Sequence, residues 1–498
     1  MAYVRTVKTA SGARAVQIVY SSRRGARKIE HVGSAHDDAE LEALKAAATQ
    51  RLAEGQAELN LGLDAAAGSG PLEITSSRMA HLWDALCRAY DALGFTDATG
   101  GDVVFRDLVF ARIIEPTSKL DSLRVLSEVG LVPVSYRTVT RRLPTYSEES
   151  WRHKLAAACA AHASLGPKSL VLYDVSTLYF ETDKADGFRE PGFSKERRLE
   201  PQITIGLLTD GSGFPLMVQA FEGNKAETKT MLPVITSFMT AHQLGDVTVV
   251  ADAGMVSETN RNAIEDAKLT YIIGERIPEV PYQVKKWRTE HPDVQIPDGH
   301  VFVQPWPANN TQRAQGRRDK VVYYQYRADR ARRTLRGIDE QVAKAEKAVA
   351  GKTPVKRNRF VKLAGGDKSV NRELEAKTRG IAGLKAYITN IDNPTPEFVI
   401  GAYHQLWRIE KSFRMSKHDL RARPIYHHKR ESIDAHLAIV FAALAVTRLI
   451  EDRTGWSIKK FVRTTRRYRT VEVRAGKQLL TAEEPLPVDL RDALAQIH

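Results

Sequence analysis

The alternation of strand and helix patterns between residues 169 and 275 constrains the fold of this chain more than any other feature. Five short apolar runs in this stretch are typical of buried strands, and they lie at 170–175, 202–208, 214–221, 247–251 and 271–274. Residues 228–242 and 257–268 have helical spacing instead, and they precede the fourth and fifth runs. The sequence therefore predicts three consecutive strands followed by two helix-strand pairs.

This element order is that of a ribonuclease-H-like fold, in which a mixed sheet carries helices, although the order alone leaves the pairing of the strands open. Residues 276–400 break the pattern with strand-like pieces and a charged helix. Residues 16–32 alternate as a β-hairpin does, and short helices follow from residue 76. The expected fold class is α/β: a ribonuclease-H-like core with a mixed sheet, an α+β insertion domain, and an N-terminal hairpin plus helical region.

The charge of the chain points to a polyanionic partner. Its 74 Lys and Arg exceed its 60 Asp and Glu, which gives a net charge of +14. Dense basic runs at 313–336 and 459–477 favour phosphate contact, although each could be a solvated face.

A predicted helix over 136–143 resembles a recognition helix for double-stranded DNA, because three arginines lie largely on one side of it: Arg137, Arg141 and Arg142. The alternative is a helical bundle with a basic surface.

Shifts in composition and pattern divide the chain into six segments. They are 1–64, a β-hairpin and helix; 72–165, a helical DNA-binding region; 166–275, the first part of the core; 276–395, the insertion domain; 396–452, the helical part of the core; and 453–498, a basic C-terminal tail.

Two cysteines cannot form a disulfide framework, so we expect a reducing compartment. The longest apolar stretch, 437–446, is about half a membrane span, so we expect no membrane partner.

Two aspartates lie where an apolar strand should carry none. Asp174 is inside or at the end of the first predicted strand, and Asp252 directly follows the fourth. Burying a carboxylate costs several kcal/mol unless it is paired or bound to metal, and Mg²⁺ prefers carboxylate oxygens. The alternative is that one or both form a strand-end turn or a helix cap. Their position on two strands of one sheet favours a metal site.

A third acid, Glu410, comes from the predicted helical segment 403–417. Tyr403, Glu410 and Lys417 are spaced by seven residues, so in one continuous helix they would share a face. A solvated Glu/Lys stripe would show the same spacing. Two strand carboxylates and one helix carboxylate are the minimum needed to hold two Mg²⁺ ions about 3.5–4 Å apart for in-line phosphoryl transfer, and Mn²⁺ could substitute.

The segment 403–417 carries a Tyr-x2-Arg-x3-Glu-x6-Lys pattern with one departure. This pattern resembles that of the DDE transposases of bacterial insertion sequences, in the IS-four-like superfamily. The sequences at 406–414 and 420–427 look like its IS-sixteen-thirty-four-type branch. The likeness runs from about residue 170 to residue 448. The departure is Leu406, which occupies the family's Arg position.

The resemblance implies a role for each matching residue. Asp174, Asp252 and Glu410 would bind the catalytic metals. Tyr403 and Lys417 would contact DNA phosphates. The phosphate contact that the family takes from its Arg would be lost here, or supplied by Arg408 or Arg414; these two are therefore candidate DNA-binding residues as well.

The expected function is that of a DNA transposase, which cleaves DNA at element ends as a metal-dependent endonuclease and transfers the strands into target DNA by cut-and-paste transposition. The expected partners are double-stranded DNA, as terminal inverted repeats and target DNA, and a second copy of the chain in a dimeric synaptic complex. The bacterial cytoplasm, with association to the nucleoid, is the expected location. Two alternatives stay open: a ribonuclease-H-like structure-specific nuclease without joining activity, and a catalytically inactive DNA-binding regulator.

Overall fold

The computed structural model describes most of the chain: residues 2–9, 12–21, 27–53, 72–166, 169–181, 184–192, 200–242, 247–254, 257–352, 358–364, 367–423, 425, 427, 429–475 and 478–497. The chain divides into two compact units. Unit 1 comprises Met1–Ala158, Arg414–Arg423 and His427–His498. Unit 2 comprises Cys159–Phe413 and Pro424–Tyr426.

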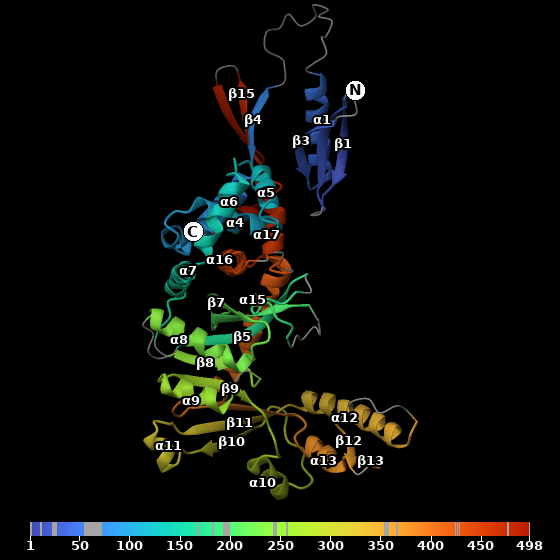
Figure 1. Ribbon diagram of the computed structural model, residues 1–498, viewed down its shortest axis with the longest axis vertical. Helices are drawn as coiled ribbons and strands as arrows, with labels where there is room; N and C mark the ends of the chain where they lie inside the picture. The colour runs from blue at the N-terminus through green and yellow to red at the C-terminus, as the bar shows by residue number, and fades with distance from the viewer. Residues whose placement is uncertain are drawn as a thin grey trace, which may run out of the picture. The chain divides into compact units, whose positions relative to one another are not determined.

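Unit 2 is built on one eight-stranded sheet in the order β10-β11-β14-β9-β8-β5-β6-β7, with β10 and β7 at its edges (Figure 1). Its strands are β5 (Ser169–Tyr179), β6 (Gln202–Asp210), β7 (Pro215–Glu222), β8 (Val247–Ala251), β9 (Thr270–Glu275), β10 (Val301–Trp306), β11 (Lys320–Tyr326) and β14 (Leu384–Thr389). The strands β5, β6 and β7 pair antiparallel, whereas β8 pairs parallel with both β5 and β9. The prediction of an α/β fold with a mixed sheet is confirmed.

Two helices complete the predicted order of strands and helices. The helix α8 (Met231–His242) buries Val234, Ile235 and Phe238, and it packs against β6 and β7. The helix α9 (Glu258–Asp266) begins where the Ser257 hydroxyl accepts a hydrogen bond from the Asn260 N–H, which satisfies one free donor of the first turn. These caps and apolar stripes are local signals, which is why the sequence predicted both helices.

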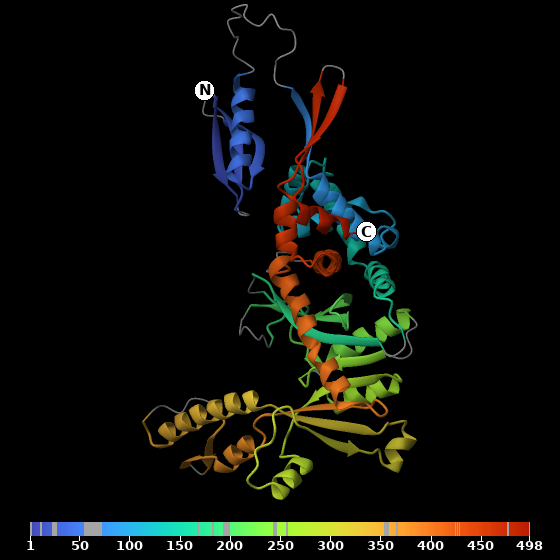
Figure 2. The ribbon, with the colours of Figure 1, turned by 180° about the vertical axis from the view of Figure 1, so that it is seen from behind.

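The segment expected as an insertion domain contributes three strands to the main sheet, because β10, β11 and β14 extend it beyond β9. Tyr323 and Tyr387 are almost fully buried and face each other across β11 and β14. Outside the sheet, α12 (Ala328–Val349), β12 (Val361–Ala364), β13 (Asp367–Val370) and α13 (Arg372–Gly380) form a lobe, shown in Figure 2. This lobe has its own small core of Ile338, Val342, Ala345 and Phe360. The remaining helices of the segment are α10 (Tyr282–Glu290) and α11 (Asn310–Ala314).

Unit 1 contains a helical bundle around α16 (Arg430–Thr454), which packs against α2 (Ala80–Ala92), α4 (Val103–Ile114) and α6 (Tyr136–Ser147). By length and composition α16 could cross a membrane, but 94% of its apolar window is buried inside the protein. A helix that is apolar on all sides and buried on all sides is typical of a domain core. The other helices of this part of the chain are α3 (Phe95–Ala98), α5 (Asp121–Val129) and α7 (Glu149–His162).

The N-terminal module of unit 1 has one more strand than the sequence predicted. A three-stranded antiparallel sheet of β1 (Ala2–Lys8), β2 (Arg14–Ser21) and β3 (Arg27–Ala35) packs against α1 (Asp38–Ala53). Their shared core includes Val16, Ile18, Leu41 and Ala48. The strand β1 was missed because no side chain on it is fully buried, so its apolar alternation is weak.

The predicted basic tail is a folded part of unit 1. It contains α17 (Ile458–Thr465), β15 (Thr470–Ala475), β16 (Gln478–Glu483) and α18 (Val488–Ala495). The strand β15 lies between β16 and β4 (Glu73–Arg78), as Figure 1 shows, and it is antiparallel to both. The strand β4 was not predicted, since its pairing partner lies about 400 residues away in sequence and pairing at such a distance leaves no local signal.

Candidate active site

Two neighbouring parallel strands place the predicted aspartates at corresponding positions. Leu172 of β5 lies opposite Val250 of β8, and each aspartate follows two residues later. Asp174 therefore lies within β5, with one carboxylate oxygen accepting the Val175 N–H at 2.8 Å, and Asp252 directly follows β8. Because parallel strands run in the same direction, both carboxylates leave the sheet at the same level.

The exposure of these acids differs from the expectation. Asp174 is only half-buried, and Asp252 and Glu410 are exposed. The argument that buried charge makes a metal necessary is therefore wrong for Asp252, since an exposed carboxylate keeps most of its hydration. Their accessibility instead leaves both carboxylates open to ligands from solution.

Tyr403 connects a helix to one of the acids. It lies near the end of α14 (Pro396–His404), is only 4% exposed, and its hydroxyl donates a hydrogen bond to Asp252 Oδ1. Burial, and then this bond to a carboxylate, raise the pKa of Tyr403 well above the ordinary tyrosine value, so the phenol keeps its proton. Gly274 of β9 provides the space, because a Cβ there would come within 2.7 Å of Tyr403 Oη. Tyr403 thus orients Asp252, and its contact with a DNA phosphate stays a prediction.

Glu410 lies on α15 (Leu406–Arg414), which the β6–β7 turn holds in place. Arg408 Nη1 donates to the Gly211 carbonyl at 2.7 Å, and Ser412 Oγ donates to the Gly213 carbonyl at 2.7 Å. Gly213 has φ +87, and a side chain there would also collide with Arg408. This close packing fixes the helix that carries Glu410. The role of Arg408 in binding phosphate stays a prediction, and its guanidinium already serves this anchor.

Lys385 of β14 is a cation at this site that the sequence reasoning missed. Its Nζ lies 4.3 Å from the centre of the Tyr403 ring and 5.8 Å from that of Tyr387. Burial lowers the pKa of Lys385, and the negative charges of Asp252 and Glu410 oppose that shift. The available signal was a lone lysine inside the apolar run of 384–389. One lysine therefore interacts with two of the three predicted acids.

The prediction that Tyr403, Glu410 and Lys417 share one continuous helical face is wrong. Two irregularities interrupt the helix: α14 ends at His404, and a π-helical turn, η2 (Met415–Asp419), follows α15. A π-turn adds residues per turn and so rotates the side chains that follow it. Lys417 is half-buried within η2, and Arg414 is exposed just before it. Both residues belong to unit 1, and their contacts with DNA stay predictions.

The predicted recognition helix exists as α6, and the Ser135 hydroxyl caps it by accepting the Thr138 N–H. Arg137, Arg141 and Arg142 are all exposed, and Arg142 forms an ion pair with the buried carboxylate of Asp102. The opposite side of α6 is buried within the bundle. The helix is confirmed, and its binding to DNA stays a prediction.

The donor atoms at the predicted metal site are carboxylate oxygens, which suit Mg²⁺ and Mn²⁺ better than softer metals. Among the residues that the structure describes, no three Asp, Glu, His or Cys side chains lie close enough together to hold a metal ion as they stand. The chemistry of the three predicted ligands therefore fits Mg²⁺, whereas their arrangement does not by itself define the coordination.

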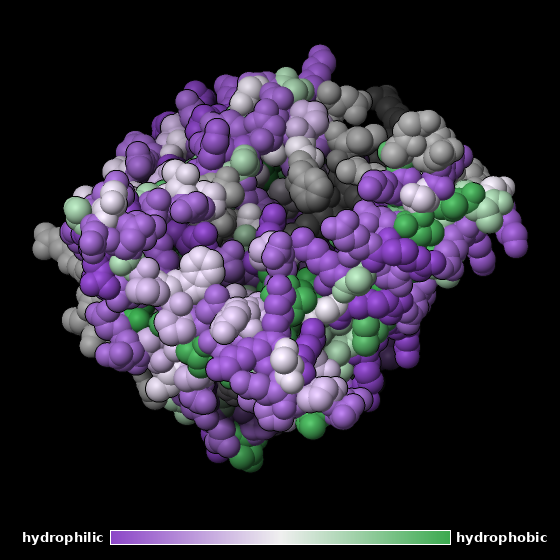
Figure 3. All heavy atoms as spheres, turned by 90° about the horizontal axis from the view of Figure 1, so that it is seen from below, coloured by the Kyte–Doolittle hydropathy of each residue, from purple (hydrophilic) through white to green (hydrophobic). Residues whose placement is uncertain are grey.

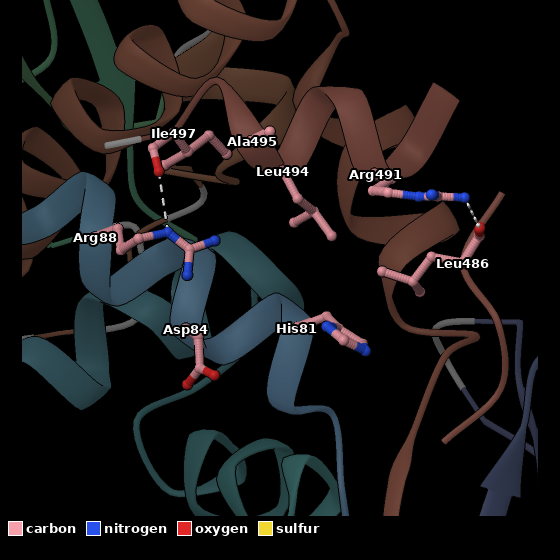
Figure 4. A pocket seen from close by; sticks show the side chains of 8 residues that line it. All are labelled: His81, Asp84, Arg88, Leu486, Arg491, Leu494, Ala495 and Ile497. Carbon is pink, nitrogen blue, oxygen red and sulfur yellow. Dashed lines mark hydrogen bonds between the residues drawn. The ribbon is translucent and has the colours of Figure 1, made fainter. Parts of the chain in front are cut away.

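A cavity of about 430 Å³ in unit 1 lies between α2 and α18 (Figure 4). Arg88 Nε donates to the Ile497 carbonyl at 2.9 Å, and Arg491 donates to the Leu486 carbonyl at 3.4 Å. Leu494 and Ile497 contribute apolar surface to its wall. The bond from Arg88 ties the C-terminal segment to α2 of the bundle, whereas the bond from Arg491 stays within the C-terminal segment, so we interpret the cavity as structural.

Comparison with known families gives one match over much of the chain. A family model described as a transposase DDE domain matches residues 165–446, which is more than half of the chain and includes Asp174, Asp252 and Glu410. No curated protein matches the chain. A solved structure with some likeness is the cryo-EM synaptic complex of piggyBac transposase with hairpin DNA, at 12% identity and a TM-score of 0.38, over 77% of this chain and 70% of that one. A TM-score of that size carries no argument about the fold.

Proposed function

Because this chain belongs to the family of transposases with a DDE domain, we propose that it cuts DNA at the ends of a mobile element and joins those ends to target DNA by cut-and-paste transposition. The observation that supports this proposal most is that the matched region contains Asp174 and Asp252 at corresponding positions on neighbouring strands. Cutting and joining are both attacks of an oxygen on a phosphodiester, so one set of acids can serve both steps.

Divalent metal ions are general in this family, and Asp174, Asp252 and Glu410 are the residues that would hold them here. Two Mg²⁺ ions, or Mn²⁺ in their place, would supply Lewis acidity and offset the negative charge that develops on the phosphate. The exposed positions of Asp252 and Glu410 support this assignment, because ligands for an exchangeable ion must be reachable from solution.

The surrounding residues control position and charge at the site. The Tyr403 hydroxyl fixes one oxygen of Asp252, and this leaves the other oxygen for a ligand. Arg408 and Ser412 anchor α15 and so limit where Glu410 can move. A DNA phosphate that approaches three carboxylates is repelled, and the charge of Lys385 reduces that repulsion.

The finer identity of the protein is part of the proposal. The strand order β7-β6-β5-β8-β9, with its antiparallel and parallel halves, supports a ribonuclease-H-like catalytic core. The sequence pattern at 403–417 supports the IS-four-like superfamily, the IS-sixteen-thirty-four-type branch, and a bacterial cytoplasmic location associated with the nucleoid. We propose a dimer as the form that holds two element ends.

The proposed DNA partners are the terminal inverted repeats and the target. The net charge of +14 and the exposed Arg137 and Arg141 of α6 support binding to a polyanion. The surface seen in Figure 3 is mainly hydrophilic, with hydrophobic residues in small separate groups, as suits a partner that is itself polar.

A joining assay tests the proposal. Sequencing the DNA that flanks the gene gives the candidate inverted repeats, and pre-cleaved repeat ends are then incubated with a supercoiled plasmid and Mg²⁺ or Mn²⁺. We expect covalently joined products from the wild-type protein and none from Asp252→Asn, which keeps the shape of the side chain. Hydrolysis of the plasmid without joining would favour the structure-specific nuclease, and binding of the ends with neither joining nor hydrolysis would favour the inactive regulator.

A further inference from the structure

A second cavity in unit 1 has features of an anion site that the proposed active site does not use. Its volume is about 680 Å³. Its walls come from the end of α4, from α5, from η2 and Arg421, from the first turns of α17, and from His36 next to α1. The segments that surround the cavity are distant in sequence, so unit 1 must be fully folded for the cavity to exist.

Positive charge exceeds negative charge around this cavity. Six cations line it, Arg124, Arg421, Lys459, Lys460, Arg463 and Arg466, against three acids, Glu115, Asp121 and Asp419. Asp419 pairs with Lys459 at 2.8 Å, and Arg124 pairs with both Glu115 and Asp121. Within the described part of the chain, Arg421, Lys460 and Arg463 form no ion pair with an acid. Three charges therefore remain available for an external anion.

The backbone presents these free cations together. Lys460 and Arg463 are three residues apart on α17, which places them on one face of the helix. Lys460 Nζ lies 3.6 Å from the centre of the Trp456 ring, so an aromatic surface holds its ammonium group at the start of the helix. Arg421 has φ +44, a left-handed conformation that non-glycine residues rarely adopt and that clusters at functional positions.

Buried polar atoms at the cavity also lack partners. Arg466 is 7% exposed, and its Nε has no hydrogen-bond acceptor, although its Nη2 approaches Glu115 at 3.6 Å and Glu128 at 3.7 Å. His36 Nε2 is likewise buried without a partner. Burial, and then the charge of Arg466, lower the pKa of His36 to about 4. Buried N–H groups are nearly always satisfied in proteins, so an acceptor entering the cavity would complete this arrangement.

We propose that this cavity binds two successive backbone phosphates of double-stranded DNA. The choice of DNA as the ligand rests on the proposed function, since a transposase must hold duplex DNA. A backbone phosphate is favoured over a small free anion because Lys460 and Arg463 follow one another along the surface of α17, as successive phosphates do along a strand. The cavity thus gives unit 1 a DNA contact that does not depend on base sequence.

Salt dependence of binding tests this assignment without requiring catalysis. The full-length wild type, Lys460→Gln/Arg463→Gln, and the control Lys154→Gln/Arg491→Gln are titrated without metal against a fluorescent duplex of arbitrary sequence. The control removes the same two charges from exposed positions on α7 and α18 of the same unit. We expect the slope of log K against log salt to fall by roughly 1.8 in the cavity variant, about 0.9 for each lost contact, and to stay unchanged in the control.

An unchanged slope in the cavity variant, or an equal fall in both variants, would overturn the proposal. Inorganic pyrophosphate at constant ionic strength separates the two possible sources of phosphate. If it raises the thermal midpoint of the wild type only, while the DNA slopes of wild type and cavity variant agree, then the ligand is a free phosphate compound rather than DNA. A last outcome is that the slopes of the two variants agree with the expectation while the wild-type protein never cleaves DNA with Mg²⁺. That result would refute the transposase reaction and leave the cavity assignment in place.

Discussion

The two units place their charged side chains in different ways. In unit 2, Asp252 and Lys385 come from strands of one sheet, and β9 lies between those strands, so paired backbones determine where both charges are. In unit 1, Arg137 and Arg463 lie on helices whose opposite sides are buried, and both side chains are exposed rather than fixed by strand pairing. A reacting phosphate requires fixed positions, whereas backbone phosphates need only charge within reach. We therefore expect single substitutions to have large effects in unit 2 and small effects in unit 1.

The largest effect is expected for Asp252→Asn. This change removes a charge and a proposed metal ligand with almost no change in shape, so DNA cleavage with Mg²⁺ should fall by about 1000-fold or more. Binding to element ends, measured by gel shift, should stay within about tenfold of wild type, because unit 1 supplies most of the proposed DNA contacts. Cleavage at the wild-type rate would exclude Asp252 as a ligand.

Lys385→Met is expected to have the next largest effect. A half-buried cation opposite two carboxylates is lost, and removal of such a preorganised charge costs on the order of 100-fold in rate. Lys385→Arg is the control, since it keeps the charge and should retain more activity than the methionine variant. Single-turnover cleavage at saturating DNA measures both. Equal rates in all three proteins would mean that Lys385 only packs against Tyr403.

Tyr403→Phe should have a smaller effect of a distinct kind. Without the Tyr403 hydroxyl, Asp252 loses the hydrogen bond that orients one of its carboxylate oxygens. Loss of a hydrogen-bond partner of a metal ligand typically weakens metal binding about 10-fold to 100-fold. The Mg²⁺ concentration for half-maximal cleavage should therefore rise, while the rate at saturating Mg²⁺ changes less. A reduced rate with an unchanged Mg²⁺ requirement would instead support a contact between Tyr403 and the DNA.

Arg142→Ala should have the smallest effect. Its ion pair with Asp102 is 46% exposed on the arginine side, and exposed pairs contribute less than about 1 kcal/mol. Asp102 keeps its bonds from the Phe105 N–H and the Tyr146 hydroxyl, both to Oδ1, so only its Oδ2 loses a partner. Denaturant unfolding measures the change. A loss above about 2 kcal/mol would show that unit 1 also depends on fixed charge.

The parts that the sequence predicted correctly are those with local signals. The order of strands and helices from 169 to 275 follows from apolar runs and caps, and Asp174 and Asp252 were found because a charge interrupts such a run. Lys385 interrupts a run in the same way, but its meaning depends on the pairing of β14 with β9, over about 110 residues of chain. The turn at η2 was missed because a seven-residue spacing assumes a regular helix. Long-range pairing and helix irregularity therefore account for most of the differences.

The pairing of α6 with α16 also affects the time at which unit 1 can form during synthesis. Roughly 280 residues separate the two helices, and at ~5–20 residues per second a ribosome takes about 15 to 60 s to make them. During that interval Val139, Leu143 and Tyr146 have no α16 to cover them. The sheet of unit 2, whose strands all precede residue 390, can pair before α16 emerges. We therefore expect the nascent chain to complete its catalytic sheet first and to expose the apolar side of its N-terminal helices to chaperones until α16 is released.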